Sequence, residues 1–198
     1  MIVPNMHVLV LDAPEIAIKV RPGQFVIVRG AEEGERIPLS IADFDPEKGT
    51  ITIVFREVGA STSVLAGLKA GDEILTCVGP LGNETVIDTF GSVLLVGGCY
   101  GIGSLYPVAR ALKEKGNKVS VVLEARSSYL IYWLDRYVPL AEKIYTITRD
   151  GSMGTKGHIS RLPDIIHGMR EKPDRIIVNG CTYLMAHTSE VTRDLAIP

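Results

Sequence analysis

The sequence predicts a protein of the β + α/β class, in which an N-terminal antiparallel β-barrel is followed by a parallel-sheet α/β domain. Two observations lead to this fold class. The chain has 198 residues, enough for two domains of about 100 residues that each bury a core. The spacing of apolar residues also changes near residue 90, from short alternating segments to continuous apolar runs separated by helical patterns. We therefore expect domains at residues 1–88 and 89–198.

The barrel is predicted from strand-like segments that lie between turn residues. In "GTITIVFREVG" (49–59), Ile51, Ile53 and Phe55 occupy alternate positions, as expected of a strand with one buried face. "GQFVIVRG" (23–30) is similarly rich in β-branched and aromatic residues. The turn residues stand in "RPGQ", "DPEKG", "KAGD" and "GPLGN". Short strands at this spacing favour a small antiparallel barrel.

One short helix is predicted within the barrel half, in "STSVLAGLKAG" (61–71). Ser61 or Thr62 is a suitable N-cap residue, and Gly71 is a suitable residue to end the helix.

The α/β half is predicted from four apolar strands that alternate with helices. The helix in "SLYPVARALKEKG" (104–116) has Leu105, Val108 and Leu112 on one face, and Gly116 suits its C-terminus. A last helix is expected at about 182–193. The strands are "SVLLVGG", "KVSVVLEA", "KIYTITRD" and "RIIVNG". Continuous apolar strands between helices indicate a parallel sheet that is covered on both faces.

Composition excludes several classes of function. Hydrophobic residues make up 46% of the chain, charged residues 22%, and the formal net charge is −2, so no basic surface is expected to bind nucleic acid or a membrane. No apolar run is long enough to span a bilayer, and the first residues lack the order of a signal peptide. We therefore expect a cytoplasmic protein. The three cysteines and four histidines are widely separated, so neither a disulfide framework nor a metal site of this chain is predicted.

A glycine-rich loop, "GGCYGIG" (97–103), joins the first parallel strand to the first helix of the α/β half. Gly98, Gly101 and Gly103 give the spacing G-x-x-G-x-G, which differs from the G-x-G-x-x-G dinucleotide fingerprint. Unpaired amides at the start of a helix bind a pyrophosphate well, and glycine allows close approach. The loop, including Ile102, is therefore a candidate phosphate site. The alternative is a tight turn, and Cys99 is expected only to fill a small pocket.

The end of the second parallel strand, "LEARSS" (123–128), leaves the choice of nicotinamide cofactor open. Glu124 is suited to accept a hydrogen bond from the ribose 2'-hydroxyl of NAD, and its charge would repel a 2'-phosphate. Arg126, followed by two serines, is equally suited to bind the 2'-phosphate of NADP. A third interpretation is that both side chains are simply solvated.

Four stretches that occur in order carry a resemblance to a known family. They are "RIPLSIAD" (36–43), "VFREVGAST" (54–62), "GGCYGIG" (97–103) and "DGSMGTKG" (150–157). Together they resemble the ferredoxin reductase-like flavoproteins, and within them the electron-transfer subunits of NADH-dependent ferredoxin:NADP oxidoreductase, sulfide dehydrogenase and dihydroorotate dehydrogenase. The resemblance covers nearly the whole chain. It implies a flavin-binding barrel for FAD followed by an α/β domain for NAD(H) or NADP(H).

The resemblance also assigns residues of the barrel to the flavin. It implies that the isoalloxazine ring lies against Pro38, Leu39 and Ser40, with the Ser40 hydroxyl near flavin N5. Without the resemblance, Ser40 would be read as an ordinary strand serine. The family pattern is R-x-x-S, whereas Arg36 stands four residues before Ser40, so Arg36 reaches the FAD phosphates only if the strand is bulged near Pro38.

A second group of barrel residues is assigned on the same basis. Val54, Phe55 and Arg56 are expected to contact the flavin through backbone and ring contacts, and Arg56 is expected to share or replace the role of Arg36. Gly59, Ser61 and Thr62 are expected to hold the FAD pyrophosphate at a helix start. The alternative for these three residues is a simple helix N-cap.

In the α/β half, the resemblance places two segments near the nicotinamide. Gly180 and Met185 in "NGCTYLM" match the family's C-G-P-x-x-M segment, although Asn179 and Cys181 depart from it. Asp150 and Gly151 follow another strand at the same sheet edge and are also expected to reach the nicotinamide.

The expected function is that of a flavoprotein electron-transfer subunit. Hydride passes from NAD(P)H to N5 of FAD, and single electrons then pass to an iron–sulfur acceptor, either a larger iron–sulfur or flavoprotein subunit or a ferredoxin. A [2Fe-2S] centre needs four cysteines, so we expect it only in a segment that follows residue 198. The alternatives are a stand-alone NAD(P)H-dependent flavin reductase and a non-catalytic nucleotide-binding subunit.

Overall fold

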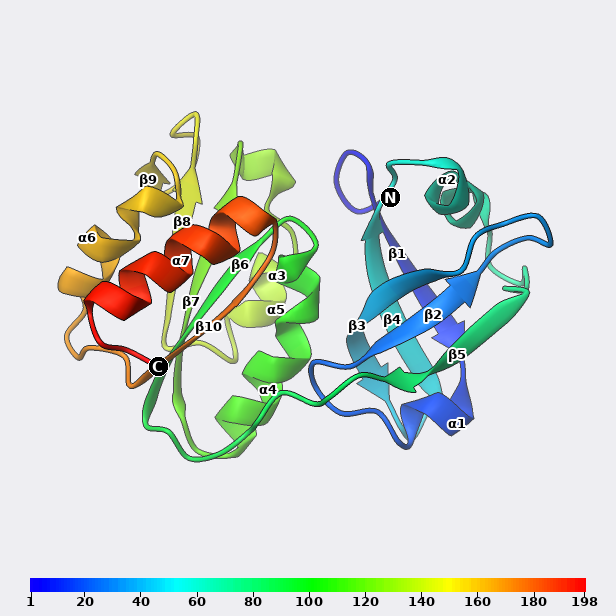
Figure 1. Cartoon of the computed structure of the whole chain (residues 1–198), viewed down its shortest axis with the longest axis horizontal. Helices are drawn as coiled ribbons and strands as arrows, with labels where there is room; N and C mark the ends of the chain where they lie inside the picture. Colours follow the sequence, from blue (N-terminus) through cyan, green and yellow to red (C-terminus); the bar gives the residue numbers. More distant parts are fainter. The chain divides into compact units, whose positions relative to one another are not determined.

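The structure, a computed structural model, describes residues 1–198. The chain divides into two compact units, Met1–Val86 and Ile87–Pro198 (Figure 1). The division falls two residues before the predicted boundary between residues 88 and 89. Each unit contains its own sheet. The strands of the first sheet are antiparallel, and those of the second are parallel.

The first unit is built on five antiparallel strands, as the sequence predicts. The strands are β1 (Met6–Asp12), β2 (Phe25–Arg29), β3 (Ile37–Asp45), β4 (Thr50–Arg56) and β5 (Thr76–Leu81), in the order β1-β4-β3-β2-β5. The two outer strands, β1 and β5, are not hydrogen-bonded to each other. The barrel is therefore open between β1 and β5.

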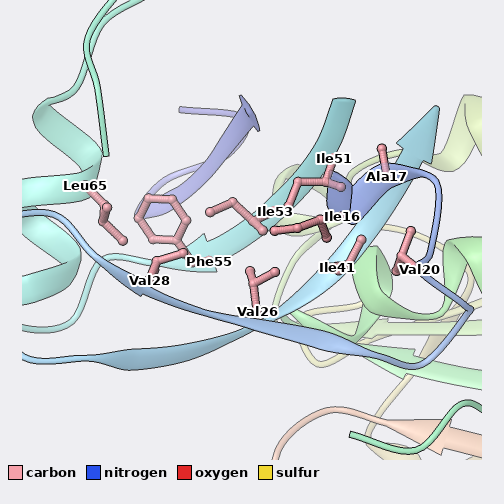
Figure 2. Close-up of a cluster of buried hydrophobic side chains, with 10 residues drawn as sticks. All are labelled: Ile16, Ala17, Val20, Val26, Val28, Ile41, Ile51, Ile53, Phe55 and Leu65. Carbon is pink, nitrogen blue, oxygen red and sulfur yellow. The ribbon is translucent and has the colours of Figure 1, made fainter. Parts of the chain in front are cut away.

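The core of this unit lies inside the curved sheet (Figure 2). Ile51, Ile53 and Phe55 of β4 are at most 2% exposed, which confirms the alternation read from the sequence. Val26 and Val28 of β2 contribute from across the sheet, and both are fully buried. Helix α1 (Pro14–Ala17) adds buried side chains to the same cluster. A four-residue helix is too short to show a helical period, so it was not predicted.

The second helix of the unit, α2, begins earlier and ends earlier than predicted. It covers Ala60–Gly67, and its N-cap is Gly59 in an extended conformation, so neither Ser61 nor Thr62 is the N-cap residue. The helix ends because Leu68 is extended. Gly71, with φ of +96°, belongs to a separate turn closed by the hydrogen bond from the Asp72 amide to the Lys69 carbonyl.

The second unit contains five parallel strands in the order β10-β6-β7-β8-β9. This arrangement confirms the predicted parallel sheet, although the short β9 was not predicted. The strands are β6 (Ser92–Gly98), β7 (Lys118–Ala125), β8 (Lys143–Thr148), β9 (Thr155–Lys156) and β10 (Arg175–Asn179). The helices are α3 (Gly101–Ser104), α4 (Tyr106–Glu114), α5 (Leu134–Tyr137), α6 (Leu162–His167) and α7 (Thr182–Asp194), with 3-10 turns at Ser128–Leu130 and Ile159–Arg161.

Helices cover both faces of this sheet, which explains why all seven residues of β6 are buried. Leu94 and Val96 pack in a cluster with residues of α6 and α7, whereas Gly97 lies against Ile102 and Leu105 around α3. Leu112 is among the buried residues of α4, as the helical period predicts. None of the helices is both long and apolar enough to cross a lipid bilayer.

The strand order creates a switch point between β6 and β10. From β6 the chain continues to β7 and β8 on one side, and it returns to β10 on the other side. In open parallel sheets, ligands bind where the strand order reverses, outside the carboxyl ends of the strands. The loops after β6 and β10 are therefore the first place to look for a nucleotide site.

Candidate functional site

In the first unit, β3 and β4 present a surface that faces away from the core. Ile41 pairs with Ile53, and both are buried in the core. Successive strand residues point to opposite faces, so the neighbouring residues Ser40 and Val54 point to the outer face. Pro38 lies two residues before Ser40 and shares that outer face.

Two predicted flavin residues have side chains that point into the core instead. Leu39 packs against the hydrophobic cluster of the barrel, and Phe55 is 2% exposed within it. Only the backbone of Phe55 is therefore open to a ligand, which corrects the expectation of a ring contact. Arg56, at the end of β4, alternates with Phe55 and is exposed.

The expected bulge near Pro38 is absent. Residues 37–40 pair consecutively with residues 28–25 of β2, and the irregularity of β3 lies later, between Ile41 and Asp43. Arg36 is exposed just before β3 begins. The condition that the sequence set for Arg36 to reach the FAD phosphates is therefore not met, because no residue is inserted between Arg36 and Ser40.

The turn that leads from β4 into α2 is open and rich in unpaired amides. The first bond of the helix runs from the Ser63 amide to the Gly59 carbonyl, so the amides of Ala60, Ser61 and Thr62 have no acceptor within the helix. The Thr62 hydroxyl accepts hydrogen bonds from the amides of Val58 and Gly59 and donates to the Gly59 carbonyl. This turn presents three amides suited to bind an anion.

In the second unit, the glycines of the 97–103 loop allow close packing. A Cβ on Gly101 would lie 2.0 Å from the Asn179 carbonyl oxygen, at the end of β10. A Cβ on Gly98 would lie 2.8 Å from a methyl carbon of Leu184 in α7. Gly101 is therefore required by the neighbouring backbone, and Gly98 is closely packed against α7, whether or not a phosphate binds.

Two tyrosine hydroxyls form hydrogen bonds with the backbone of the same loop and brace it. The Tyr132 hydroxyl donates to the Cys99 carbonyl and accepts from the Gly103 amide, each at 2.9 Å. The Tyr137 hydroxyl donates to the Ile102 carbonyl at 2.6 Å. Burial raises the pKa of both tyrosines, so they remain protonated donors.

These contacts correct the predicted phosphate site. Ile102 is fully buried, and the Gly103 amide is already used by Tyr132, so neither residue is open to a ligand. The amides of Tyr100 and Gly101 have no partner within the chain. They are the donors that remain for an anion at this loop.

A hydrogen bond connects the loops at the switch point. The Tyr100 hydroxyl donates to the Gly180 carbonyl at 2.8 Å and so joins the carboxyl ends of β6 and β10. Cys99 has φ of +55°, which turns the chain sharply before α3. Cys181 and Met185 are exposed beside this junction. Gly180 and Met185 therefore lie at the switch point, and their predicted place near the nicotinamide stays a prediction.

Glu124 has protein partners that the sequence did not indicate. Its carboxylate lies 4.0 Å from Nε of Arg149 and 3.5 Å from Nδ1 of His158, and its side chain is 7% exposed. Burial raises the pKa of Glu124, and Arg149 partly offsets this effect. Burial and Arg149 lower the pKa of His158, which favours the neutral ring. Little of the Glu124 carboxylate remains open to a ribose.

A network of short polar side chains joins the loops after β7 and β8. The Ser152 hydroxyl donates to Asp150 at 2.6 Å, accepts from the Ser128 amide at 2.8 Å and lies 3.2 Å from the Ser127 hydroxyl. The hydrogen bonds of Ser127 and Ser152 lower the pKa of Asp150 to about 2. The Asp150 amide donates to the carbonyl of Arg126, which is exposed. A carboxylate with a lowered pKa is thus held in the loop beside Arg126.

The sheet order separates two segments that were both predicted at the nicotinamide. Asp150 and Gly151 follow β8, whereas Gly180 and Met185 follow β10, and β7 and β6 lie between. Three steps of about 4.8 Å separate these strands by about 14 Å. The Asx-turn in "DGS", where the Ser152 amide donates to Asp150, is a local signal that could have revealed the Asp150 network. No local signal reveals the tyrosine braces.

No group of three or more His, Cys, Asp or Glu side chains is placed to hold a metal ion. The three cysteines are free, and only Cys181 is fully exposed.

Comparisons with known proteins cover nearly the whole chain. It is 41% identical over 188 residues to the Thermotoga maritima protein "Dihydroorotate dehydrogenase B (NAD(+)), electron transfer subunit homolog", covering 95% of this chain and 66% of the relative. It is 33% identical to the electron transfer subunit of dihydroorotate dehydrogenase B (NAD(+)) of Enterococcus faecalis, covering 92% of this chain and 70% of that protein. The chain thus spans about two thirds of the length of these relatives. No protein-family model matches it.

The chain is also similar to solved structures over nearly its whole length. A structure described as that of the NADH-dependent reduced ferredoxin–NADP oxidoreductase, studied for flavin-based electron bifurcation, superposes with a TM-score of 0.93 at 40% identity, covering 100% of this chain and 71% of the other. Phthalate dioxygenase reductase superposes with a TM-score of 0.77 at 16% identity, covering 98% of this chain and 61% of the other, and that match shows the fold alone.

Proposed function

Because the chain belongs to the ferredoxin reductase-like family of flavoprotein electron-transfer subunits, we propose that it accepts hydride from a nicotinamide dinucleotide on FAD and passes single electrons to an iron–sulfur acceptor. The observation that carries this proposal is in the first unit. Ser40 and Val54 of the paired strands β3 and β4 point away from the core. The turn that follows β4 leads into an open helix start with three unpaired amides.

These residues fit FAD. On the outer face of β3 and β4, Pro38 is exposed and Ser40 is half-buried, so both are open to a flat ring, whereas Val54 is 5% exposed and offers little of its side chain. The backbone of Leu39 and Phe55 lies along the same strands. The amides of Ala60–Thr62, with Gly59 before them, suit a pyrophosphate. Arg56 is the cation nearest in sequence to this turn, and we assign it the charge-neutralising role that was expected of Arg36.

Ser40 is the proposed catalytic residue. Its hydroxyl makes no hydrogen bond within the chain, and the residue is half-buried, so its proton is available to the ligand. When bound, the flavin supplies the chemistry of two-electron acceptance and one-electron release. The contribution of Ser40 is to donate a hydrogen bond to the ring edge where negative charge develops.

In the second unit we propose that a nicotinamide dinucleotide binds across the carboxyl ends of the strands. Its pyrophosphate lies at the amides of Tyr100 and Gly101, and its nicotinamide lies toward Gly180 and Met185. The adenosine ribose then lies toward the ends of β7 and β8, near Arg126 and the Asp150 network.

We propose NAD(H) in preference to NADP(H). The ionised Asp150 carboxylate lies in the loop beside Arg126, where a 2'-phosphate of NADP would place about two further negative charges. The hydroxyls of Ser127 and Ser152 already bond within the Asp150 network, so they are not free for a phosphate. Exposed Arg126 alone favours the phosphate.

We propose an acceptor outside this chain. The relatives at 41% and 33% identity are named as electron transfer subunits, which favours a larger iron–sulfur or flavoprotein subunit or a ferredoxin as the acceptor. The three cysteines of the chain are fewer than the four that a [2Fe-2S] centre needs. A [2Fe-2S] centre in a segment that follows residue 198 would serve equally.

Anaerobic spectroscopy of the purified chain tests this function. We expect added FAD to bind and develop protein-perturbed flavin absorbance, and NADH to bleach it. Ser40→Ala should retain FAD but slow the bleaching about 10- to 100-fold, whereas Ser160→Ala, at an exposed serine, should change nothing. Absence of any FAD binding would refute the proposal. Rapid steady turnover with free flavin as the only acceptor would instead favour a stand-alone flavin reductase.

A further inference from the structure

One acidic side chain, Glu57, connects three parts of the first unit at the start of α2. Oε2 of Glu57 lies 2.9 Å from Nε2 of His7 in β1. Oε1 accepts a hydrogen bond from the Ser63 hydroxyl in the first turn of α2 at 3.0 Å. The amide of Glu57 donates to the Asn5 carbonyl at 2.8 Å. Both carboxylate oxygens and the backbone of this residue are thus engaged.

The His7 end of this connection is fixed in the barrel core. The His7 ring stacks on the ring of Phe55, with a centroid distance of 5.5 Å and an interplanar angle of 17°. Phe55 is 2% exposed, and the side chain of His7 is 13% exposed. Glu57 therefore connects Ser63 to a ring that is stacked on the buried Phe55.

Apolar contacts alone hold α2 weakly. Leu65 is its one buried residue, and Val64 on the same helix is 43% exposed. Ala66 is partly buried and packs against the same cluster, so the apolar contacts of α2 lie in its second half, away from its first turn. The hydrogen bond from Ser63 to Glu57 supplies a second attachment point, which fixes the direction of the first turn.

The charge of Glu57 needs an explanation, because it lies two residues before the N-cap of a helix whose open amides suit an anion. An uncommitted carboxylate there would repel a pyrophosphate. We infer that Glu57 is a positioning residue for the FAD pyrophosphate: held by His7 and Ser63, it aims the amides of Ala60, Ser61 and Thr62 at the ligand. This inference rests on the proposed FAD site.

Flavin binding to the apo-protein tests the inference, with FAD and riboflavin compared because riboflavin has the ring but no phosphate. We expect Glu57→Ala to weaken FAD binding about 5- to 10-fold, because two hydrogen bonds are lost, with little change for riboflavin. Glu57→Gln keeps an oxygen for Ser63 and a polar group for His7, so its FAD affinity should remain within about twofold of the original. Glu33→Ala, at an exposed glutamate, is the matched control and should have no effect.

Ser63→Ala covers the case in which Glu57→Ala does not fold. It removes one hydrogen bond at an exposed position, and we expect FAD affinity to fall about two- to threefold.

Three results would overturn the inference. The first is tighter FAD binding by both Glu57 variants, which would mean that the charge only repels. The second is an equal loss of affinity for FAD and for riboflavin. The third is an FAD affinity of Glu57→Ala or Ser63→Ala that matches that of the original chain. If the original chain binds no FAD, the proposed function itself fails, which is a different outcome.

Discussion

The two turns that were predicted to bind phosphate, at residues 97–103 and 58–62, use their small residues in opposite ways. In the first turn, Gly98 and Gly101 lie against the neighbouring backbone and α7. Tyrosine hydroxyls accept from the Gly103 amide and donate to the Ile102 carbonyl. In the second turn, Gly59 has nothing within 4 Å of its Cβ position. The comparison teaches that a glycine near a helix start indicates close packing in one case and an open turn in the other.

The largest expected effect comes from adding one methyl group to the packed turn. Gly101→Ala would place a Cβ 2.0 Å from the Asn179 carbonyl oxygen, and backbone cannot move aside cheaply. We expect a loss of more than about 3 kcal/mol in the free energy of unfolding, or failure to fold. Thermal denaturation of the purified variant measures it.

Gly67→Ala is the control, because nothing lies within 4 Å of its Cβ position at the end of α2. Its free energy of unfolding should stay within about 0.5 kcal/mol of that of the original chain. If both variants are equally stable, the 97–103 turn is not closely packed and the comparison between the turns fails.

The tyrosine braces should give the next largest effect. Tyr137→Phe leaves the buried Ile102 carbonyl without its donor, and we expect about 1–3 kcal/mol of destabilisation, measured by urea denaturation. Tyr129→Phe changes a hydroxyl that is on a 64% exposed residue, and it should have no effect. A Tyr137→Phe chain with unchanged stability would show that the loop does not depend on the brace.

The open turn should respond in ligand binding as well as in stability. Thr62→Val removes the hydroxyl that accepts from the amides of Val58 and Gly59, which costs about 1 kcal/mol. FAD affinity, followed by fluorescence, should fall about three- to tenfold. Tyr137→Phe should leave FAD affinity unchanged as long as the chain is folded. An unchanged FAD affinity in Thr62→Val would remove this turn from the FAD site.

The smallest effect is expected at Asp150. Its lowered pKa means that ionised Asp150 stabilises the folded chain above pH 4, and this contribution is lost as the pH falls toward about 2. Asp150→Asn keeps an acceptor for Ser152 but removes the charge, so stability should lose part of its dependence on pH in that range.

The same variant tests the nicotinamide preference. We expect the ratio of kcat/KM for NADH to that for NADPH to fall about two- to tenfold in Asp150→Asn. A ratio that does not change would show that the carboxylate does not face the 2' position.

The sequence predicted what depends on local spacing. The alternation of Ile51, Ile53 and Phe55 located a strand and its buried face, and the helical period at Leu105, Val108 and Leu112 located α4 with its buried side. Both patterns are direct consequences of backbone geometry, and the four-part resemblance then identified the family.

The remaining features depend on contacts between distant residues. The acceptor for the Gly103 amide is the Tyr132 hydroxyl, 29 residues later, and the partner of Glu57 is His7, 50 residues earlier. The segments at Asp150 and Gly180 looked equivalent because both follow strands, but only the strand order shows that they lie apart. The start of α2 was misplaced because Thr62 forms its hydrogen bonds from within the first turn.

The contact between Gly101 and Asn179 has an evolutionary consequence. Two segments nearly eighty positions apart touch so closely that residue 101 cannot carry a Cβ while the Asn179 carbonyl keeps its place, and the Tyr100 hydroxyl donates to the same segment at Gly180. Substitutions at 100–101 and 179–180 should therefore be inherited together among related sequences. A related protein with a larger residue at position 101 must also have a displaced end of β10, which is where the nicotinamide is proposed to bind.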